Sequence, residues 1–147
     1  MNLKPVLLIE DNGSDILLTK RALEKGRVVN KLIIAEDGQE ALDYLFGTRE
    51  HAVPDMTELP TLVLLDLKLP KVDGLQVLGH IRANEETRTL PVVILTSSKE
   101  ERDVSASYEL GANSYIQKPV DSGKFSEIIL SVCSYWLVLN EPPPLPR

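Results

Sequence analysis

The stretch Leu62-Val63-Leu64-Leu65-Asp66-Leu67-Lys68-Leu69-Pro70-Lys71-Val72-Asp73-Gly74 decides the fold, because it joins a short apolar run to an acidic residue and a loop marked by proline and glycine. Runs of about four to six residues rich in Val, Ile and Leu are typical of buried parallel strands. Three further runs end in polar residues of types that bind metal or phosphate. They are Val6–Ile9 before Glu10-Asp11, Val92 to Leu95 before Thr96-Ser97, and Ser114–Gln117 before Lys118-Pro119.

Segments with helical patterns separate these runs. A fifth run, Leu32–Ala35, completes the set of strands. The first helix is expected to end at Gly26, and the second to begin at Asp37. A later helix is expected over residues 99–110, ending at Gly111, and the last from Asp121 or Ser122 to about Leu139. The alternation predicts an α/β fold, a doubly wound (βα)5 flavodoxin-like domain with a parallel five-stranded sheet of order 2-1-3-4-5. We expect this domain to cover residues 1–140, with a proline-rich tail over 141–147.

Composition excludes several classes of protein. The chain has 147 residues, a one-domain length, and its net charge of −6 argues against a nucleic-acid surface. No apolar stretch approaches the roughly 20 residues that span a bilayer, and the N-terminus lacks the apolar core of a signal peptide. A single cysteine, Cys133, forms no internal disulfide and builds no zinc site by itself. We therefore expect a cytoplasmic protein.

The carboxyl ends of parallel strands lie along one edge of a sheet, where ligands bind in such folds. Glu10, Asp11 and Asp66 are expected to meet there. Carboxylates so near to one another raise each other's pKa values unless a positive charge lies among them. Mg²⁺ suits this cluster because it binds carboxylate oxygens and keeps waters for a phosphate donor. Asp66 can then act as a nucleophile and form an aspartyl phosphate, with Lys118 and Thr96 contacting the phosphoryl oxygens.

Each of these residues also has an ordinary structural explanation when taken alone. An Asp after a strand is usually a turn or helix N-cap residue, which would suffice for Asp11 or Asp66. Thr96 alone fits a strand end, and Lys118 alone a solvated surface. The joint pattern of four polar strand ends in the right order favours a single site over four coincidences.

Four segments together resemble the receiver domains of two-component response regulators. They are Leu7 to Asp11, Leu64 to Gly74, Ile94 to Ser97 and Tyr115 to Pro119. The resemblance implies that Asp66 accepts a phosphoryl group from a sensor histidine kinase, so that the protein is a self-phosphorylating and self-dephosphorylating acceptor and not an enzyme with turnover. It further implies that Glu10 and Asp11 form an acidic pair, with Asp11 binding Mg²⁺ directly beside Asp66 and the Lys68 backbone carbonyl.

The same resemblance implies a switch. Thr96 and Lys118 stand where the family has its switch hydroxyl and invariant lysine, and Tyr115 stands where it has its switch aromatic. The hypothesis is that phosphate draws Thr96 inward and that Tyr115 turns toward the space vacated. The resemblance also implies that the Lys118–Pro119 bond is cis. The dipeptide alone would not suggest this, because X-Pro bonds are cis only at low frequency.

A long connection resembles a narrower group within this family. Gly47 to Pro60 exceeds the typical connection of about two to six residues. With the Pro70 to Gly74 segment and a Trp136-Leu137 helix end before prolines, it is similar to the single-domain regulators that serve phytochrome-type kinases. His51 and His80 lack acidic partners in the sequence and are expected to be surface residues.

The end of the last helix is expected to need a covering partner. Its residues from Leu130 to Leu139 are apolar on almost every face, and the proline-rich tail or another protein must cover them. We expect a homodimer through the face of the fourth and fifth helices, or a kinase contact at this helix. A histidine phosphotransfer protein or a downstream target is a further candidate partner, because no output domain follows Leu139.

Two rival classes share the fold or the chemistry. Aspartyl-phosphate phosphatases of the haloacid-dehalogenase type also use a strand-end Asp and Mg²⁺, but their nucleophile follows the first strand in an Asp-x-Asp pattern. Here Asp66-Leu67-Lys68 follows the third strand. A flavodoxin-like electron carrier needs a loop rich in Ser, Thr and Gly after the first strand, where Glu10-Asp11 would repel the FMN phosphate.

Overall fold

The structure, a computed structural model, describes residues 3–47 and 59–144 of the chain. Five parallel strands form one sheet in the order β2-β1-β3-β4-β5, which confirms the predicted topology. The strands are β1 (Val6–Ile9), β2 (Leu32–Ala35), β3 (Leu62–Leu65), β4 (Val92–Thr96) and β5 (Ser114–Gln117). The helices are α1 (Gly13–Lys25), α2 (Gly38–Phe46), α3 (Gly74–Ala83), α4 (Glu101–Glu109) and α5 (Ser122–Cys133), which continues as a π-helical segment, η1 (Ser134–Leu139).

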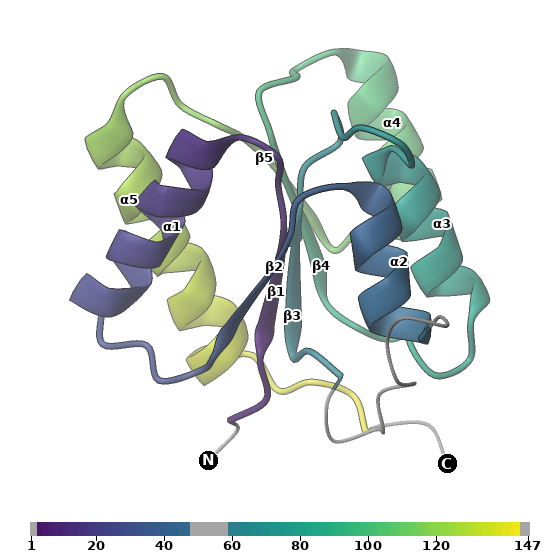
Figure 1. Ribbon diagram of the computed structural model, residues 1–147, viewed down its shortest axis with the longest axis horizontal. Coiled ribbons are helices and arrows are strands. Elements are labelled where there is room, and N and C mark those ends of the chain that lie inside the picture. The colour runs from purple at the N-terminus through teal and green to yellow at the C-terminus, as the bar shows by residue number, and fades with distance from the viewer. Residues whose placement is uncertain (1–2, 48–58, 145–147) are drawn as a thin grey trace.

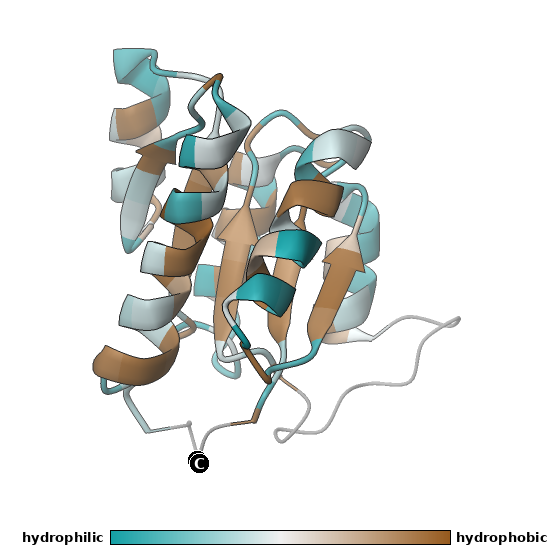
Figure 2. Ribbon diagram, turned by 90° about the vertical axis from the view of Figure 1, so that its left-hand side faces the viewer, coloured by the Kyte–Doolittle hydropathy of each residue, from teal (hydrophilic) through white to brown (hydrophobic). Residues whose placement is uncertain are grey.

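Helices cover both faces of the sheet. Figure 1 shows α1 and α5 on one face and α2, α3 and α4 on the other. Because successive strand residues point to opposite faces, Leu7 and Ile9 of β1 join the core beneath α2 and α3, while Val6 and Leu8 join the core beneath α1 and α5. The central strands β1, β3 and β4 are buried along their whole length, and Figure 2 shows them as continuous apolar ribbons.

Side-chain caps begin four of the five α-helices. Asn12, Asp37 and Asp121 each accept a hydrogen bond from the backbone N–H three residues on, which confirms the start predicted at Asp37 and selects Asp121 for α5. Asp73 and Gln76 form a reciprocal capping box at α3 that we did not predict. The fifth, α4, begins at Glu101, two residues later than expected, without a side-chain cap.

The end of α1 predicted at Gly26 is confirmed, whereas the cis bond predicted before Pro119 is wrong. The helix ends at Lys25 with Gly26 as its C-cap, but Gly26 is not itself left-handed. The left-handed residue is Arg27, with φ of 55°, after which the Val28 N–H donates to the Leu23 carbonyl. Gly26 serves close packing instead, because a Cβ there would lie 2.3 Å from Cδ2 of Leu130 on α5. No cis peptide bond occurs among the described residues, so Lys118–Pro119 is trans, the isomer that X-Pro bonds intrinsically favour.

The end of α4 follows the prediction, since Gly111 takes a φ of 98° directly after Leu110. The long connection between α2 and β3 is present, but its residues 48–58, with His51, lie outside the described part of the chain. No helix within the described residues is long and apolar enough to cross a membrane.

Candidate functional site

Backbone hydrogen bonds align the carboxyl ends of the strands. The Glu10 N–H donates to the Ala35 carbonyl at 3.0 Å, and the Asp66 N–H donates to the Ile9 carbonyl at 3.0 Å. On the other side of β4, the Lys118 N–H donates to the Thr96 carbonyl at 2.7 Å. The residues that directly follow three strands, together with the last residue of β4, therefore lie at one edge of the sheet. This edge is at the top of Figure 1.

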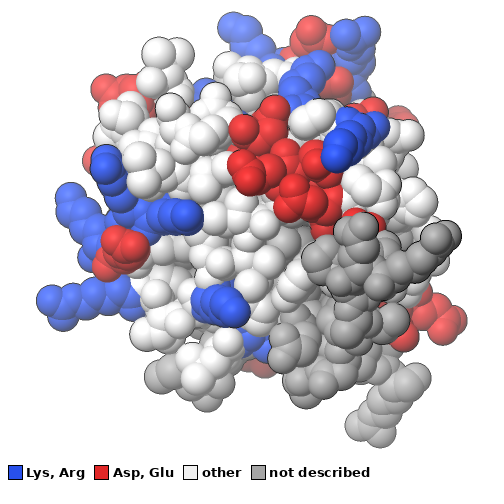
Figure 3. Space-filling view, viewed as in Figure 1, with Lys and Arg blue, Asp and Glu red and all other residues white. Residues whose placement is uncertain are grey.

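Three carboxylates gather at this edge as predicted. Glu10, Asp11 and Asp66 each place an oxygen within 4.8 Å of the others. Glu10 and Asp66 are buried, with exposures of 2% and 7%, whereas Asp11 is exposed and faces the entrance. Figure 3 shows acidic side chains gathered on the upper half of the molecule, on the side where the strands end.

The Lys118 ammonium is the buried counter-charge of the cluster. Its Nζ donates to Glu10 Oε1 at 2.5 Å, to Asp15 Oδ2 at 2.9 Å and to Asp66 Oδ2 at 3.2 Å. The Lys118 side chain is only 10% exposed, so these charge-assisted bonds are shielded from solvent. Asp15 was not among the residues predicted for the site. It lies in the first turn of α1, which begins directly after the Glu10 to Asn12 segment, and its place at the helix start next to the polar strand end is the signal that could have indicated it.

Burial and charge shift the pKa values of this pair. Burial raises the pKa of Glu10 to about 7, and the Asp66 charge adds to the effect, while the hydrogen bond from Lys118 opposes it. Burial alone would lower the pKa of Lys118, but its hydrogen bonds to Glu10 and Asp15 and the charge of Asp66 outweigh this and raise it. Lys118 therefore keeps its proton at neutral pH, whereas Glu10 gains or loses its proton near pH 7.

The free oxygens of the cluster fit a hard divalent cation. Lys118 contacts Oε1 of Glu10 and Oδ2 of Asp66, which leaves the second oxygen of each carboxylate for other partners. Glu10 Oε2 accepts from the Asn12 N–H at 3.2 Å, and Asp66 Oδ1 accepts from the Lys68 N–H at 3.4 Å. Asp11 remains exposed beside them. This all-oxygen donor set is the kind that Mg²⁺ and Mn²⁺ bind.

A glycine holds the β3–α3 loop against the acceptor strand. A Cβ on Gly74 would lie 2.3 Å from the Asp66 carbonyl oxygen and 2.6 Å from the Leu67 Cα, distances that no side chain tolerates. The Gly74 N–H also donates to the Leu67 carbonyl at 3.0 Å. This contact explains why glycine follows Asp73 in the stretch that decides the fold.

Thr96 and Tyr115 lie on the neighbouring strands. Thr96 is fully buried at the end of β4, and its hydroxyl accepts a long bond, 3.5 Å, from the Ser98 N–H. Tyr115 is half-buried on β5, and its hydroxyl donates to the Ser98 carbonyl at 2.8 Å. The Tyr115 ring thus already lies inward against the β4–α4 loop in this structure.

Beside the site, a second polar group links this loop to the acceptor segment. The Ser98 hydroxyl donates to Asp103 Oδ2 at 2.5 Å, and the Lys68 ammonium lies 3.9 Å from the same oxygen. Asp103 was not predicted as a site residue, although its place in the first turn of the helix after β4 parallels that of Asp15 after β1.

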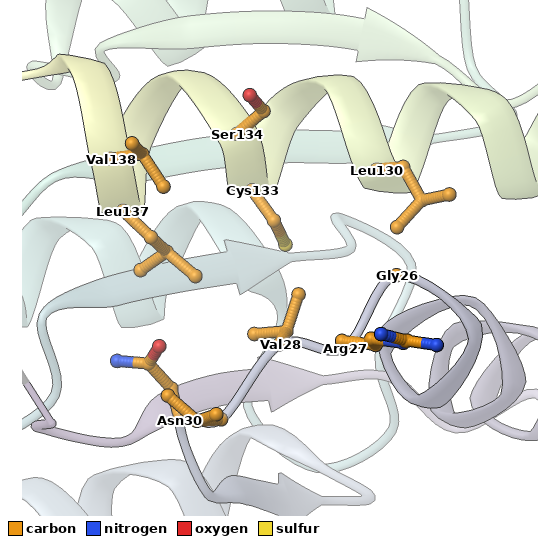
Figure 4. A pocket seen from close by; sticks show the side chains of 10 residues that line it. Gly26, Arg27, Val28, Asn30, Leu130, Cys133, Ser134, Leu137 and Val138 are labelled. Carbon is orange, nitrogen blue, oxygen red and sulfur yellow. The ribbon is translucent and has the colours of Figure 1, made fainter.

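Within the described part of the chain, a large cavity lies at each end of the fold. One of about 500 Å³ opens at the carboxyl edge and is lined by Asp11, Lys68 and Asp103 among others, so it is the entrance to the site. The larger, about 580 Å³, lies between the α1–β2 connection and the end of α5, and Figure 4 shows Val28 and Leu137 at its walls. None of the site residues lines this larger cavity.

Comparison with known proteins identifies the family. The family model of the response regulator receiver domain matches residues 6–130. Response regulator Rcp1 of Synechocystis is 38% identical over 134 residues, which cover 91% of this chain and 89% of that protein. The probable methanogenesis regulatory protein FilR2 of Methanothrix harundinacea is 39% identical over 138 residues, 94% of this chain and 86% of its own.

Solved structures agree with the sequence relatives. The Mn²⁺-bound form of Rcp1 superposes with a TM-score of 0.87 at 37% identity, covering 96% of this chain and 99% of that one. The phosphorylated cyanobacterial phytochrome response regulator RcpA gives 0.87 at 35% identity, with coverage of 96% and 99%. These matches set aside the phosphatase and flavodoxin families. The chain belongs to the response regulator receiver domain family.

Proposed function

We propose that the protein accepts a phosphoryl group on Asp66 from the phosphohistidine of a sensor kinase and thereby changes its protein contacts. The observation that carries this proposal is the convergence on Lys118 of Asp66 and two further carboxylates at the strand ends. Asp66 is held in place by the Ile9 carbonyl on one side and Lys118 on the other. It is the one member of the cluster that follows the central strand β3.

In the transfer step, a carboxylate oxygen of Asp66 attacks the phosphorus atom. The new oxygen–phosphorus bond forms as the bond from phosphorus to the histidine nitrogen breaks, and the electron pair leaves with the kinase imidazole. Negative charge spreads over the three phosphoryl oxygens, and the Lys118 ammonium and the Thr96 hydroxyl are proposed to stabilise it. The product is an aspartyl phosphate. Water later attacks its phosphorus atom, the bond from phosphorus to the Asp66 oxygen breaks, and inorganic phosphate leaves with Asp66 restored as a carboxylate.

Glu10, Asp11 and Asp66, with the backbone carbonyl of Lys68, are proposed to hold Mg²⁺. The clustered carboxylates support this, and so does the existence of a Mn²⁺-bound form of the relative Rcp1. When bound, the ion neutralises charge on the carboxylates and the phosphoryl oxygens. The Glu10 pKa near 7 reflects burial first and then the same crowding of negative charge.

Phosphorylation is proposed to act through Thr96 and Tyr115. A phosphoryl group carries about −1.5 to −2 charges near neutral pH and offers strong acceptors to the Thr96 hydroxyl. Thr96 already bonds weakly to the Ser98 N–H, and the Ser98 carbonyl receives the Tyr115 hydroxyl. A shift of Thr96 therefore moves the loop that Tyr115 holds, and with it the face of α4, β5 and α5.

The proposed partner is a phytochrome-type histidine kinase, with a histidine phosphotransfer or downstream target protein as a further acceptor or reader. The support is the similarity of this chain to RcpA, a cyanobacterial phytochrome response regulator. Homodimerisation through the α4–α5 face is proposed from exposed apolar side chains on α4, before α5 and on η1. They are Tyr108, Val120, Tyr135, Val138 and Leu139. We place the protein in the cytoplasm, where such kinases present their phosphohistidine.

The test is incubation with acetyl phosphate and Mg²⁺, followed by mass spectrometry. The wild type is expected to gain the mass of one phosphoryl group, located on Asp66 by peptide mapping, and Asp66→Asn is expected to gain none. Withdrawal of Mg²⁺ with a chelator is expected to abolish the adduct. An adduct on Asp66→Asn equal to that of the wild type would refute the assignment.

A further inference from the structure

Asp103 makes two contacts that the receiver chemistry does not explain. Its Oδ2 accepts from the Ser98 hydroxyl at 2.5 Å and lies 3.9 Å from the Lys68 ammonium. The Asp103 side chain is only 14% exposed, whereas that of Lys68 is 63% exposed. Asp103 is therefore the largely buried member of this ion pair, in the first turn of α4, and Lys68 is the exposed member.

The ion pair spans the entrance to the acceptor. Lys68 follows Asp66 by two residues, and its N–H donates to Asp66 Oδ1 at 3.4 Å. Lys68 and Asp103 line the same cavity as Asp11 and Asp73. Among the described charged residues that line this entrance, Lys68 is the one cation and the other three are acidic. These described side chains carry net negative charge, and the ammonium that follows Asp66 is paired with one of them.

We propose that Asp103 is a positioning residue that holds the Lys68 ammonium away from the incoming phosphoryl group and so slows transfer from small anionic phosphodonors. The inference rests on the proposed function of Asp66. When acetyl phosphate reacts, a carboxylate oxygen of Asp66 bonds to phosphorus and acetate leaves with the electron pair of the broken oxygen–phosphorus bond. A free Lys68 ammonium would stabilise the charge on the transferring phosphoryl oxygens, and Asp103 competes for that ammonium.

The decisive variant is Asp103→Asn, because the amide oxygen still accepts from the Ser98 hydroxyl while the charge that holds Lys68 is removed. We expect the rate of phosphorylation by acetyl phosphate to rise about two- to fivefold, the size of effect that a partly exposed ion pair produces. In a Lys68→Met background the same substitution is expected to change the rate by less than about 1.5-fold, since the competing ammonium is gone. Glu109→Gln, at the exposed far end of α4, is the control for removal of a charge from this helix.

The rates are measured by mass spectrometry at saturating Mg²⁺ and about 0.3 M salt, where long-range charge effects are screened. A rise with Asp103→Asn that disappears in the Lys68→Met background supports the proposal. An unchanged rate with Asp103→Asn, or an equal rise in both backgrounds, overturns it. Failure of the wild type to gain a phosphoryl group refutes the proposed function instead, so the two failures are distinguishable.

Discussion

Replacement of Lys118 by methionine tests the electrostatic logic of the site. Methionine keeps much of the side-chain volume but removes the ammonium that donates to Glu10, Asp15 and Asp66. Glu10 and Asp66 are largely buried, so water replaces the lost partner only in part. Removal of one member of a buried ion pair costs about 3–5 kcal/mol, and because Asp15 is partly exposed we expect a loss near 3 kcal/mol at about pH 8 without metal.

The loss is expected to shrink as the pH falls. Burial raises the pKa of Glu10 to about 7 in the native protein, above its ordinary value of 4.5. Between these values the native state binds a proton that the unfolded state does not, so the free energy of unfolding decreases as pH rises through this window. Without Lys118, which opposes the upward shift, the pKa of Glu10 rises further. Near pH 5.5 the carboxyl group is then neutral, and most of the penalty of the variant disappears.

Urea denaturation followed by circular dichroism, in a chelator, measures the effect at both pH values. With an m-value of about 1–3 kcal/mol/M, a loss of 3 kcal/mol lowers the midpoint by about 1–3 M. Lys124→Met, on the exposed surface of α5, is the matched control and is expected to stay within about 0.5 kcal/mol of the wild type. A Lys118→Met variant as stable as this control, or destabilised equally at both pH values, would show that Lys118 does not compensate buried carboxylates.

Three further predictions concern packing and local bonds. Gly74→Ala is expected to destabilise the protein by more than about 3 kcal/mol in thermal unfolding, because its Cβ would overlap the Asp66 carbonyl. In the control Gly79→Ala, on the same helix, the new Cβ meets nothing within 4 Å, and the free energy of unfolding should rise by about 0.5–1 kcal/mol. Burial raises the pKa of the Cys133 thiol to about 11. At neutral pH this thiol should therefore react with a thiol reagent only after denaturant is added, and rapid reaction in the native protein would contradict its burial. Tyr115→Phe removes the bond to the Ser98 carbonyl and is expected to cost about 1 kcal/mol in urea unfolding, with no change indicating that water replaces the bond.

The strands and their order could be predicted because their signals are local. Short apolar runs bounded by turn residues identify buried strands, and alternation with helices restricts the sheet to parallel topologies. The bounds of β1, β2, β3 and β5 match the predicted runs, and β4 extends one residue further to Thr96. The helix starts at Asp37 and Asp121 also follow from a side chain that caps its own first turn.

Contacts between distant residues are what the sequence did not reveal. The close approach of Gly26 to Leu130 is one example, because these residues lie more than a hundred positions apart in the chain. The expectation of a cis Lys118–Pro119 bond came from the family resemblance, whereas the observed trans isomer is the one that an X-Pro bond intrinsically favours. Asp15 and Asp103 were missed because a carboxylate in the first turn of a helix ordinarily needs no partner beyond the helix itself.

The sequence by itself determined the sheet, the edge at which the polar strand ends meet, and the identity of the residues there. Hydrophobic periodicity predicts the strands, and parallel topology brings their carboxyl ends to one edge whatever the details of packing. The residues that meet there are Glu10, Asp66, Thr96 and Lys118. Only the tertiary structure decided how those residues share charge. It gave Lys118 three carboxylate partners, drew Lys68 toward Asp103, and placed the Tyr115 hydroxyl on the Ser98 carbonyl. The reason is that a hydrogen bond or ion pair depends on separations of a few tenths of an ångström, which are set when the layers of the fold pack together and not by any local run of residues.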